Sequence, residues 1–204
     1  MLMKPVRHFR NSLLLLLLLP ALSWSQQKEV TIRIGQEESV VLDSYESTIT
    51  LQRKSFKIQV LLQNVGGVYV FASFTDSICC RLSELDTIAG FRDLPDRTMR
   101  EPEYNKEKEL LVNDDNSCAY WFYDKEKTWH GFNKKVILLD DGRIVATKTV
   151  KQVYNVTTQK EIKLKDMNRP LYLLFVAVSE SDASGKPLKE LMRKKVKIDW
   201  IDED

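Results

Sequence analysis

Histidine is the scarcest chemically versatile residue in this sequence. The 204-residue chain has two histidines, His8 and His130, and the first lies in a leader that we expect to be removed. One remaining histidine excludes catalytic and zinc sites that need two. The sequence also has no H-E-x-x-H, no G-x-S-x-G, no glycine-rich phosphate loop and no C-x-x-C. We therefore predict a protein that is not an enzyme and that holds no cofactor and no metal.

Cysteine is scarce and odd in number. The chain has three cysteines, Cys79, Cys80 and Cys118. In an oxidising compartment Cys118 can form a disulfide with Cys79 or Cys80, which leaves one thiol over. Neighbouring residues of a strand point to opposite faces, so only one of the two adjacent cysteines can meet Cys118. The alternative is that all three are small buried apolar residues without a bond.

No apolar run in the sequence is long enough to cross a membrane. The run that begins at Leu13 has about ten residues, and a spanning helix needs about 20. It follows three basic residues and precedes Ser23-Trp24-Ser25, which is the arrangement of a signal peptide. We predict a signal peptide at residues 1–25 and a secreted or periplasmic protein at residues 26–204, with an uncleaved membrane anchor as the alternative.

Neither sign of charge dominates the sequence. The chain has 31 basic and 29 acidic residues, and the predicted leader contains three of the basic and none of the acidic ones. The remaining chain is therefore close to neutral. This balance gives no electrostatic reason to expect binding to nucleic acid or to an anionic membrane.

Helical periodicity is weak, and short runs rich in β-branched and aromatic residues take its place. Val30, Ile32 and Ile34 alternate with polar residues, which predicts a half-buried strand. Leu171 to Val178 is an unbroken apolar run, which is typical of a central strand buried on both faces. Nine to ten such segments predict a single all-β domain, an antiparallel two-sheet β-sandwich of Ig-like or jelly-roll-like type. A closed barrel is the alternative.

Glycine-containing turns separate several of the predicted strands. Asn64-Val65-Gly66-Gly67 and Asp140-Asp141-Gly142 each stand between two apolar runs, and both predict β-hairpins. Residues 92–108 are too polar for a core strand and predict a long loop. Pro187 to Met192 predicts one helical turn. The basic run Arg193 to Lys197 predicts the solvated face of an edge strand, which discourages aggregation.

Asn116 to Asn133 is the most distinctive stretch, because two aromatic runs flank the polar residues Asp124 to Lys127. This pattern predicts a hairpin whose aromatic side chains alternate between two faces. If Tyr123 pairs with Thr128, one face carries Tyr120, Phe122 and Trp129. The other face carries Trp121, Tyr123 and His130. Both faces can be core, or one can bind a protein or a carbohydrate. We predict the binding residues Trp121, Tyr123, Trp129 and His130.

These features together favour an exported, non-catalytic binding or structural protein of the cell envelope. We expect it to contact another protein through the aromatic hairpin and the long loop. The alternative is a carbohydrate-binding module or a glycan-acting hydrolase, because 29 acidic residues offer many carboxylate pairs. A third possibility is an assembly subunit that completes its sheet with a strand of a partner. Asn155-Val156-Thr157 also matches the N-glycosylation pattern.

Overall fold

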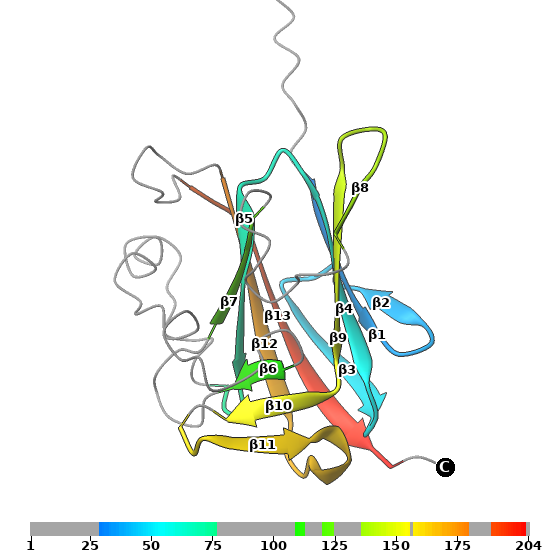
Figure 1. The fold of residues 1–204 in the computed structure, drawn as a ribbon, viewed down its shortest axis with the longest axis vertical. Coiled ribbons are helices and arrows are strands. Elements are labelled where there is room, and N and C mark those ends of the chain that lie inside the picture. The colour runs from blue at the N-terminus through cyan, green and yellow to red at the C-terminus, as the bar shows by residue number, and fades with distance from the viewer. Residues whose placement is uncertain are drawn as a thin grey trace, which may run out of the picture.

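The computed structural model describes residues 29–76, 109–112, 120–124, 136–155, 157–179 and 189–202. These residues form thirteen strands and one 3₁₀ turn (Figure 1). The prediction of an all-β chain is therefore confirmed. No helix in the described ranges has the length and the apolar character that crossing a membrane requires. The predicted signal peptide and the loop at residues 92–108 lie outside these ranges.

Five antiparallel strands form the first sheet, called sheet 1 here. Alternation along its strands directs Ile32, Ile34, Ile58 and Val60 to one buried face, as the sequence pattern predicts. The strands in spatial order are β2 (Ser39–Val41), β1 (Glu29–Gly35), β4 (Phe56–Gln63), β9 (Ile144–Val150) and β8 (Val136–Leu138).

Sheet 2 also has five strands, and its centre is the apolar run that begins at Leu171. Seven of the eight residues of this run pair with a residue of each neighbouring strand, and all but Tyr172 are buried. One edge strand pairs in parallel, whereas the other pairs are antiparallel. The strands in spatial order are β3 (Glu46–Gln52), β13 (Glu190–Ile201), β12 (Leu171–Val178), β5 (Gly67–Ser73) and β7 (Tyr120–Asp124).

A three-stranded sheet 3 lies across one end of the two larger sheets (Figure 1). The chain enters it from β9 with only Lys151 between the two strands. The chain leaves sheet 3 after Lys163 through the 3₁₀ turn η1 (Leu164–Asp166). The strands in spatial order are β11 (Lys160–Lys163), β10 (Gln152–Asn155) and β6 (Glu109–Val112). Sheet 3 was not predicted as a separate sheet.

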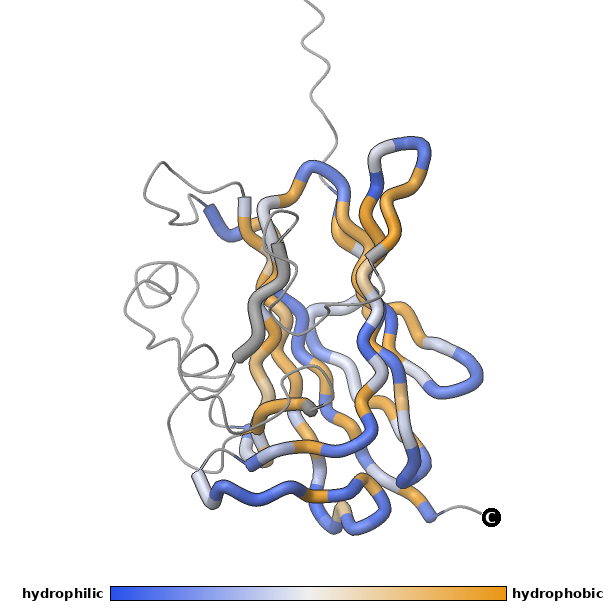
Figure 2. The backbone as a smooth tube through the Cα atoms, viewed as in Figure 1, coloured by the Kyte–Doolittle hydropathy of each residue, from blue (hydrophilic) through white to orange (hydrophobic). Residues whose placement is uncertain are grey.

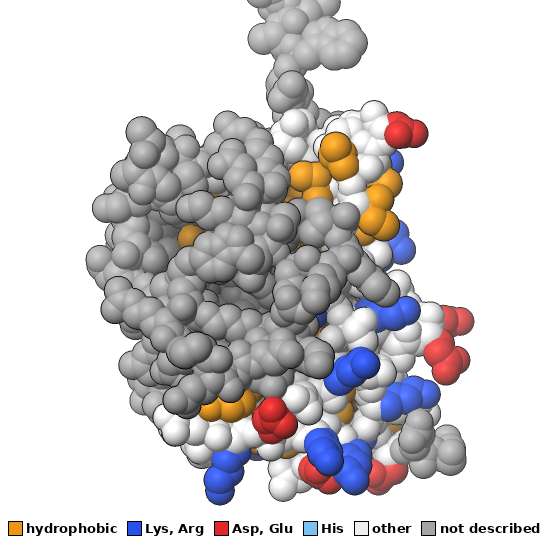
Figure 3. All heavy atoms as spheres, in the orientation of Figure 1, with side chains coloured by type: hydrophobic (Ala, Val, Ile, Leu, Met, Phe, Trp, Pro, Cys, Tyr) orange, Lys and Arg blue, Asp and Glu red, His pale blue; other side chains and the backbone are white. Residues whose placement is uncertain are grey.

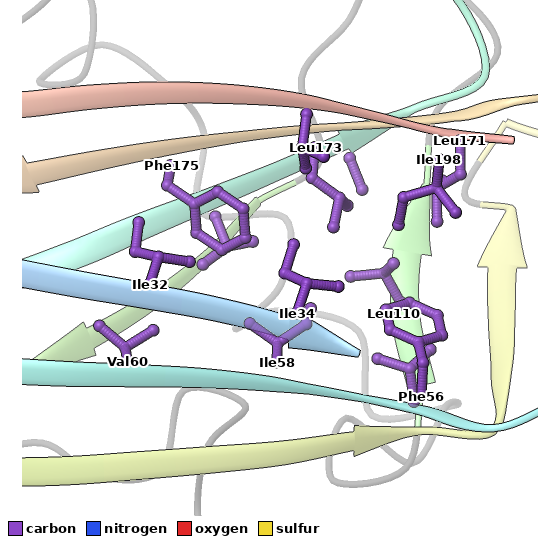
Figure 4. Close-up of a cluster of buried hydrophobic side chains, with 14 of the residues drawn as sticks. Ile32, Ile34, Phe56, Ile58, Val60, Leu110, Leu171, Leu173, Phe175 and Ile198 are labelled. Atoms are coloured by element: carbon purple, nitrogen blue, oxygen red, sulfur yellow. The ribbon is translucent and has the colours of Figure 1, made fainter. Parts of the chain in front are cut away.

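The main hydrophobic core lies between sheets 1 and 2 and is continued by sheet 3 (Figure 4). Phe56 and Phe175 are among its largest fully buried side chains, and burial of such a side chain stabilises the fold by about 1.5–3 kcal/mol. Hydrophobic residues are concentrated along the strands, and hydrophilic residues are concentrated in the turns (Figure 2). Leu110, Val153 and Leu164 contribute from the sheet 3 side.

The predicted hairpin at Asn64 to Gly67 is wrong. The strand before it, β4, pairs with β1 and β9, and the strand after it, β5, pairs with β12 and β7. The connection therefore crosses from sheet 1 to sheet 2. Asn64 has a positive φ of 55°, and the Gly66 N–H donates to the carbonyl of Val178 at 3.0 Å. The same turn residues serve a hairpin or a crossing, because both need a sharp change of direction.

The predicted hairpin at Asp140 to Gly142 is confirmed. β8 and β9 pair antiparallel on either side of it, and Gly142 has the positive φ, 80°, that this turn requires. The Leu139 N–H donates to the Arg143 carbonyl at 2.8 Å, which closes the turn. The helical turn predicted at Pro187 to Met192 is wrong for its described part, because β13 begins at Glu190.

Candidate functional site

The aromatic stretch contributes β7 at one edge of sheet 2. Of the predicted binding residues, Trp121 and Tyr123 belong to this strand, whereas Trp129 and His130 lie outside the described residues. The described partner of β7 is β5, in antiparallel pairing. The predicted pairing of Tyr123 with Thr128 also falls outside the described ranges. So does the predicted disulfide, with Cys79, Cys80 and Cys118.

The register of β7 assigns its residues to the two faces of sheet 2. Trp121 stands opposite Val70, which belongs to the core between the sheets. Tyr123 likewise stands opposite Val68 in the same core. Directly opposite residues of an antiparallel pair share a sheet face, so these two positions share the core face. Tyr120 and Phe122 share the other face, and the role of Trp121 and Tyr123 in binding stays a prediction.

Sheet 2 is buried on the face that points away from the main core as well. Tyr69 and Phe71 stack there, with ring centroids 6.2 Å apart and an interplanar angle of 20°. Leu174 and Val176 of β12 are fully buried and lie outside the main core cluster. This face therefore forms a second apolar layer, which the alternation of β12 cannot distinguish from the first.

The basic run Arg193 to Lys197 does not lie on an edge strand, so this prediction is wrong. β13 stands between β3 and β12. Arg193 is buried and forms two hydrogen bonds to the carboxylate of Glu190, from Nε at 2.9 Å and from Nη2 at 2.8 Å. The sequence shows the charges of this strand but not that it lies between two other strands.

Lys195 holds two carboxylates in a polar hollow on the same face of sheet 2. Its Nζ lies 2.6 Å from Asp76 Oδ1 and 3.2 Å from Glu46 Oε1. The hollow has a volume of about 310 Å³, and Tyr172 and Lys197 line it as well. Burial by itself lowers the pKa of Lys195, but the hydrogen bonds to Asp76 and Glu46 outweigh burial and raise that pKa above its ordinary value.

Asp141 forms an ion pair with Arg143 in the turn before β9. Arg143 donates hydrogen bonds to Asp141 from its side chain and its backbone, and these bonds hold the pKa of Asp141 below its ordinary value. A general acid for glycoside hydrolysis needs a raised pKa instead. The described residues contain no group of three or more His, Cys, Asp or Glu side chains that could hold a metal ion.

A groove runs between the β1–β2 turn and β3, and its volume is about 530 Å³. The side-chain amide of Gln36 closes one end of it. The Nε2 of Gln36 donates to the carbonyl of Gln52 at 2.8 Å, and its Oε1 accepts from the Gln52 N–H at 3.1 Å. The sequence does not indicate this groove, because a single glutamine beside two glutamates in a turn gives no signal of such a contact.

The most exposed of the large apolar side chains of the described strands lie at an edge of sheet 1. Ile137 and Leu138 of β8 are 58% and 71% exposed. Figure 3 shows hydrophobic side chains gathered over the β8–β9 hairpin, at the upper right. We call Ile137 and Leu138 the apolar edge.

The glycosylation pattern at Asn155 coincides with a buried side chain. Asn155 is 1% exposed, and its Oδ1 accepts a hydrogen bond from the Thr158 N–H at 3.1 Å. The asparagine thus stabilises the turn between β10 and β11. The hydrogen bond to Thr158 is a structural reason for an asparagine at position 155 that does not involve glycosylation.

Comparison of the chain with models of protein families finds no match, and comparison with curated proteins finds none either.

Proposed function

We propose that the chain is an exported, non-catalytic β-sandwich protein of the cell envelope that binds another protein. The leader composition supports export. Sheets 1 and 2, which enclose the main core, support the sandwich, with sheet 3 closing one end. The crossing from β4 to β5 supports the Ig-like form, whose Greek-key connections pass between the two sheets.

The apolar edge is the observation that carries this proposal. Natural proteins usually protect edge strands with charged residues or proline, because an edge offers unpaired backbone groups to other chains. β8 instead exposes Ile137 and Leu138, which are consecutive in the strand and so present apolar side chains on both of its faces. An edge strand with exposed apolar side chains is prone to pair with another chain. The partner is a protein of the same compartment, because an apolar edge pairs with another polypeptide.

The pairing of charged groups supports a role without catalysis. Catalytic acids and bases are recognised by pKa values moved toward neutral pH. The pKa of Lys195 is raised and the pKa of Asp141 is lowered, so both groups stay charged near neutral pH. Such groups stabilise strands rather than transfer protons.

The aromatic stretch stays part of the proposed binding surface. Among the described strands, β7 stands at one edge of sheet 2, and Trp121 and Tyr123 belong to it. Trp129, His130 and the loop at residues 92–108 belong to the same proposal. Aromatic residues at an edge suit the anchoring of a protein partner.

Carbohydrate binding or hydrolysis is the second candidate, and the polar hollow around Lys195 favours it. Glu46 and Asp76 converge there beside Tyr172, which offers an aromatic ring and a hydroxyl. Lys195 binds both carboxylates, however, so neither is free to act as an acid or a nucleophile. We therefore place protein binding first.

Site-specific photocrosslinking tests the proposed function. A photoreactive amino acid at position 137 should give one specific adduct in the cells that produce the protein. The same amino acid at position 161, an exposed site on β11, is the control and should give none. Leu138→Asp should remove the adduct at position 137. Equal crosslinking at both positions, or none at either, would overturn the proposal.

A further inference from the structure

The backbone of β3 has one paired and one open side. The Lys195 N–H donates to the Tyr45 carbonyl at 2.7 Å, and the Arg53 N–H donates to the Ile201 carbonyl at 3.1 Å. Successive peptide groups of a strand point to opposite sides, so alternate residues bond to one neighbour. The odd-numbered residues from Tyr45 to Arg53 therefore face β13. The N–H and C=O groups of the even-numbered residues face away from it.

A side-chain amide already fills one position on the open side. Gln52 is even-numbered, and both of its backbone groups bond to the carboxamide of Gln36. This carboxamide has the donor and the acceptor of a peptide group. At the other end of the strand, the Glu46 carbonyl accepts from the Ser44 hydroxyl at 2.5 Å. The outward groups of Thr48 and Thr50 lie between them, and within the described ranges nothing is bonded to them.

The surroundings of this open edge have room for a chain. Thr48 to Gln52 form one wall of the groove, and Glu37, Glu38 and Val40 lie on the other. Ile34, Ile49 and Leu51 give it an apolar lining, and Val40 is 53% exposed. A strand beside β3 would direct every second side chain toward this lining.

We propose that β3 accepts an extended segment of a partner protein as an added strand. The segment pairs its backbone with Thr48 and Thr50 and places apolar side chains at alternate positions into the groove. This inference goes beyond the proposed function, because β3 is an edge of sheet 2 and the apolar edge belongs to sheet 1.

The shape of the groove selects a single chain over the edge of a second folded copy. The β1–β2 turn forms a wall beside β3, and the amide of Gln36 blocks pairing beyond Thr50. Only a short extended segment fits between these limits. Glu37 forms an ion pair with Lys54 at 3.6 Å, whereas Glu38 has no ion-pair partner among the described residues. The segment should therefore carry a basic residue near Glu38.

Binding of short synthetic peptides tests the inference. The probe is a panel of acetylated and amidated peptides that alternate valine and threonine and carry one lysine at successive positions. We expect saturable binding by fluorescence anisotropy and slower hydrogen exchange of the Thr48 and Thr50 amides when the peptide is bound. The control is the same panel with alternate peptide nitrogens methylated, which cannot pair with a strand edge. No saturable binding, or equal binding of the methylated panel, would overturn the inference.

A matched pair of variants locates the contact. Thr50→Pro removes only an outward N–H, and proline is tolerated on edge strands. We expect it to weaken peptide binding about tenfold, the effect of one lost hydrogen bond. Thr50→Val keeps the N–H and should bind as the parent does. Equal binding by both variants, or a dimer that Thr50→Pro dissociates, would overturn the assignment to a partner segment. Neither result alters the crosslinking expected at position 137.

Discussion

At the scale of single residues, Gly142 shows how one backbone angle supports a hairpin. Its φ is 80°, and no atom lies within 4 Å of the position that a Cβ would take. An alanine there would thus meet no clash, and its whole cost is the left-handed backbone. We predict that Gly142→Ala lowers the free energy of unfolding by about 1 kcal/mol. Gly142→Asn should cost less, because asparagine tolerates this region. Urea unfolding measures both, and equal losses would contradict the explanation.

Lys195 predicts a pH dependence of stability. The pKa of Lys195 is raised in the folded state, so its stabilising effect is complete below the unfolded value of about 10.4 and is lost as the pH rises toward the folded value. Lys195→Met should lower the free energy of unfolding by about 1 kcal/mol at neutral pH, since Glu46 and Asp76 are solvent-exposed.

The difference between parent and Lys195→Met should shrink above pH of about 10.4. Urea unfolding at neutral and at strongly alkaline pH measures this difference. Lys57→Met, at an exposed position of β4, is the control and should change little at either pH. A difference that stays constant into the alkaline range would contradict the role of the ammonium.

At the scale of elements, the sequence was sufficient to locate most strands but not to pair them. Alternation at Phe56 to Leu62 and the apolar run at Leu171 depend only on near neighbours in the chain, and both strands are present. Pairing depends on residues far away. β4 and β5 were therefore joined wrongly, and sheet 3 was missed because the parallel partner of β10 comes from residues 109–112.

The two faces of β12 give a prediction at this scale. Leu173 points into the main core, and Leu174 points to the second apolar layer, yet both are fully buried. Leu173→Ala and Leu174→Ala should each lower the free energy of unfolding by about 2–5 kcal/mol. Thermal or urea unfolding of the two variants makes the comparison. If Leu174→Ala costs no more than a surface change, the second layer does not contribute to stability.

At the scale of the whole molecule, the candidate site was less predictable than the fold. Trp121 and Tyr123 were correctly placed on a strand, but the groove at β3 was not foreseen. Its elements are separated in the sequence, and Gln36 gains its role only when Gln52 is brought beside it. A pattern of aromatic residues is visible along the chain, whereas an open backbone edge is a property of the assembled sheets.

The proposed export gives a prediction for the N-terminus of the exported protein. The protein recovered outside the cytoplasm should begin at Gln26, because the leader is expected to be cleaved after Ser25. Intact-mass measurement with N-terminal sequencing decides this. A recovered chain that still begins at Met1 would contradict the predicted signal peptide.

The parallel pairing of β3 with β13 has a consequence for how the molecule reaches its native state. Glu46 and Lys195 meet across this pair although 149 positions separate them. Contacts of such high contact order slow folding, because a long stretch of chain must be closed into a loop first. A nascent chain that emerges with β3 cannot complete sheet 2 until β13 has been synthesised. During that interval the strand is open to aggregation, so a chaperone that shields it would raise the folded yield.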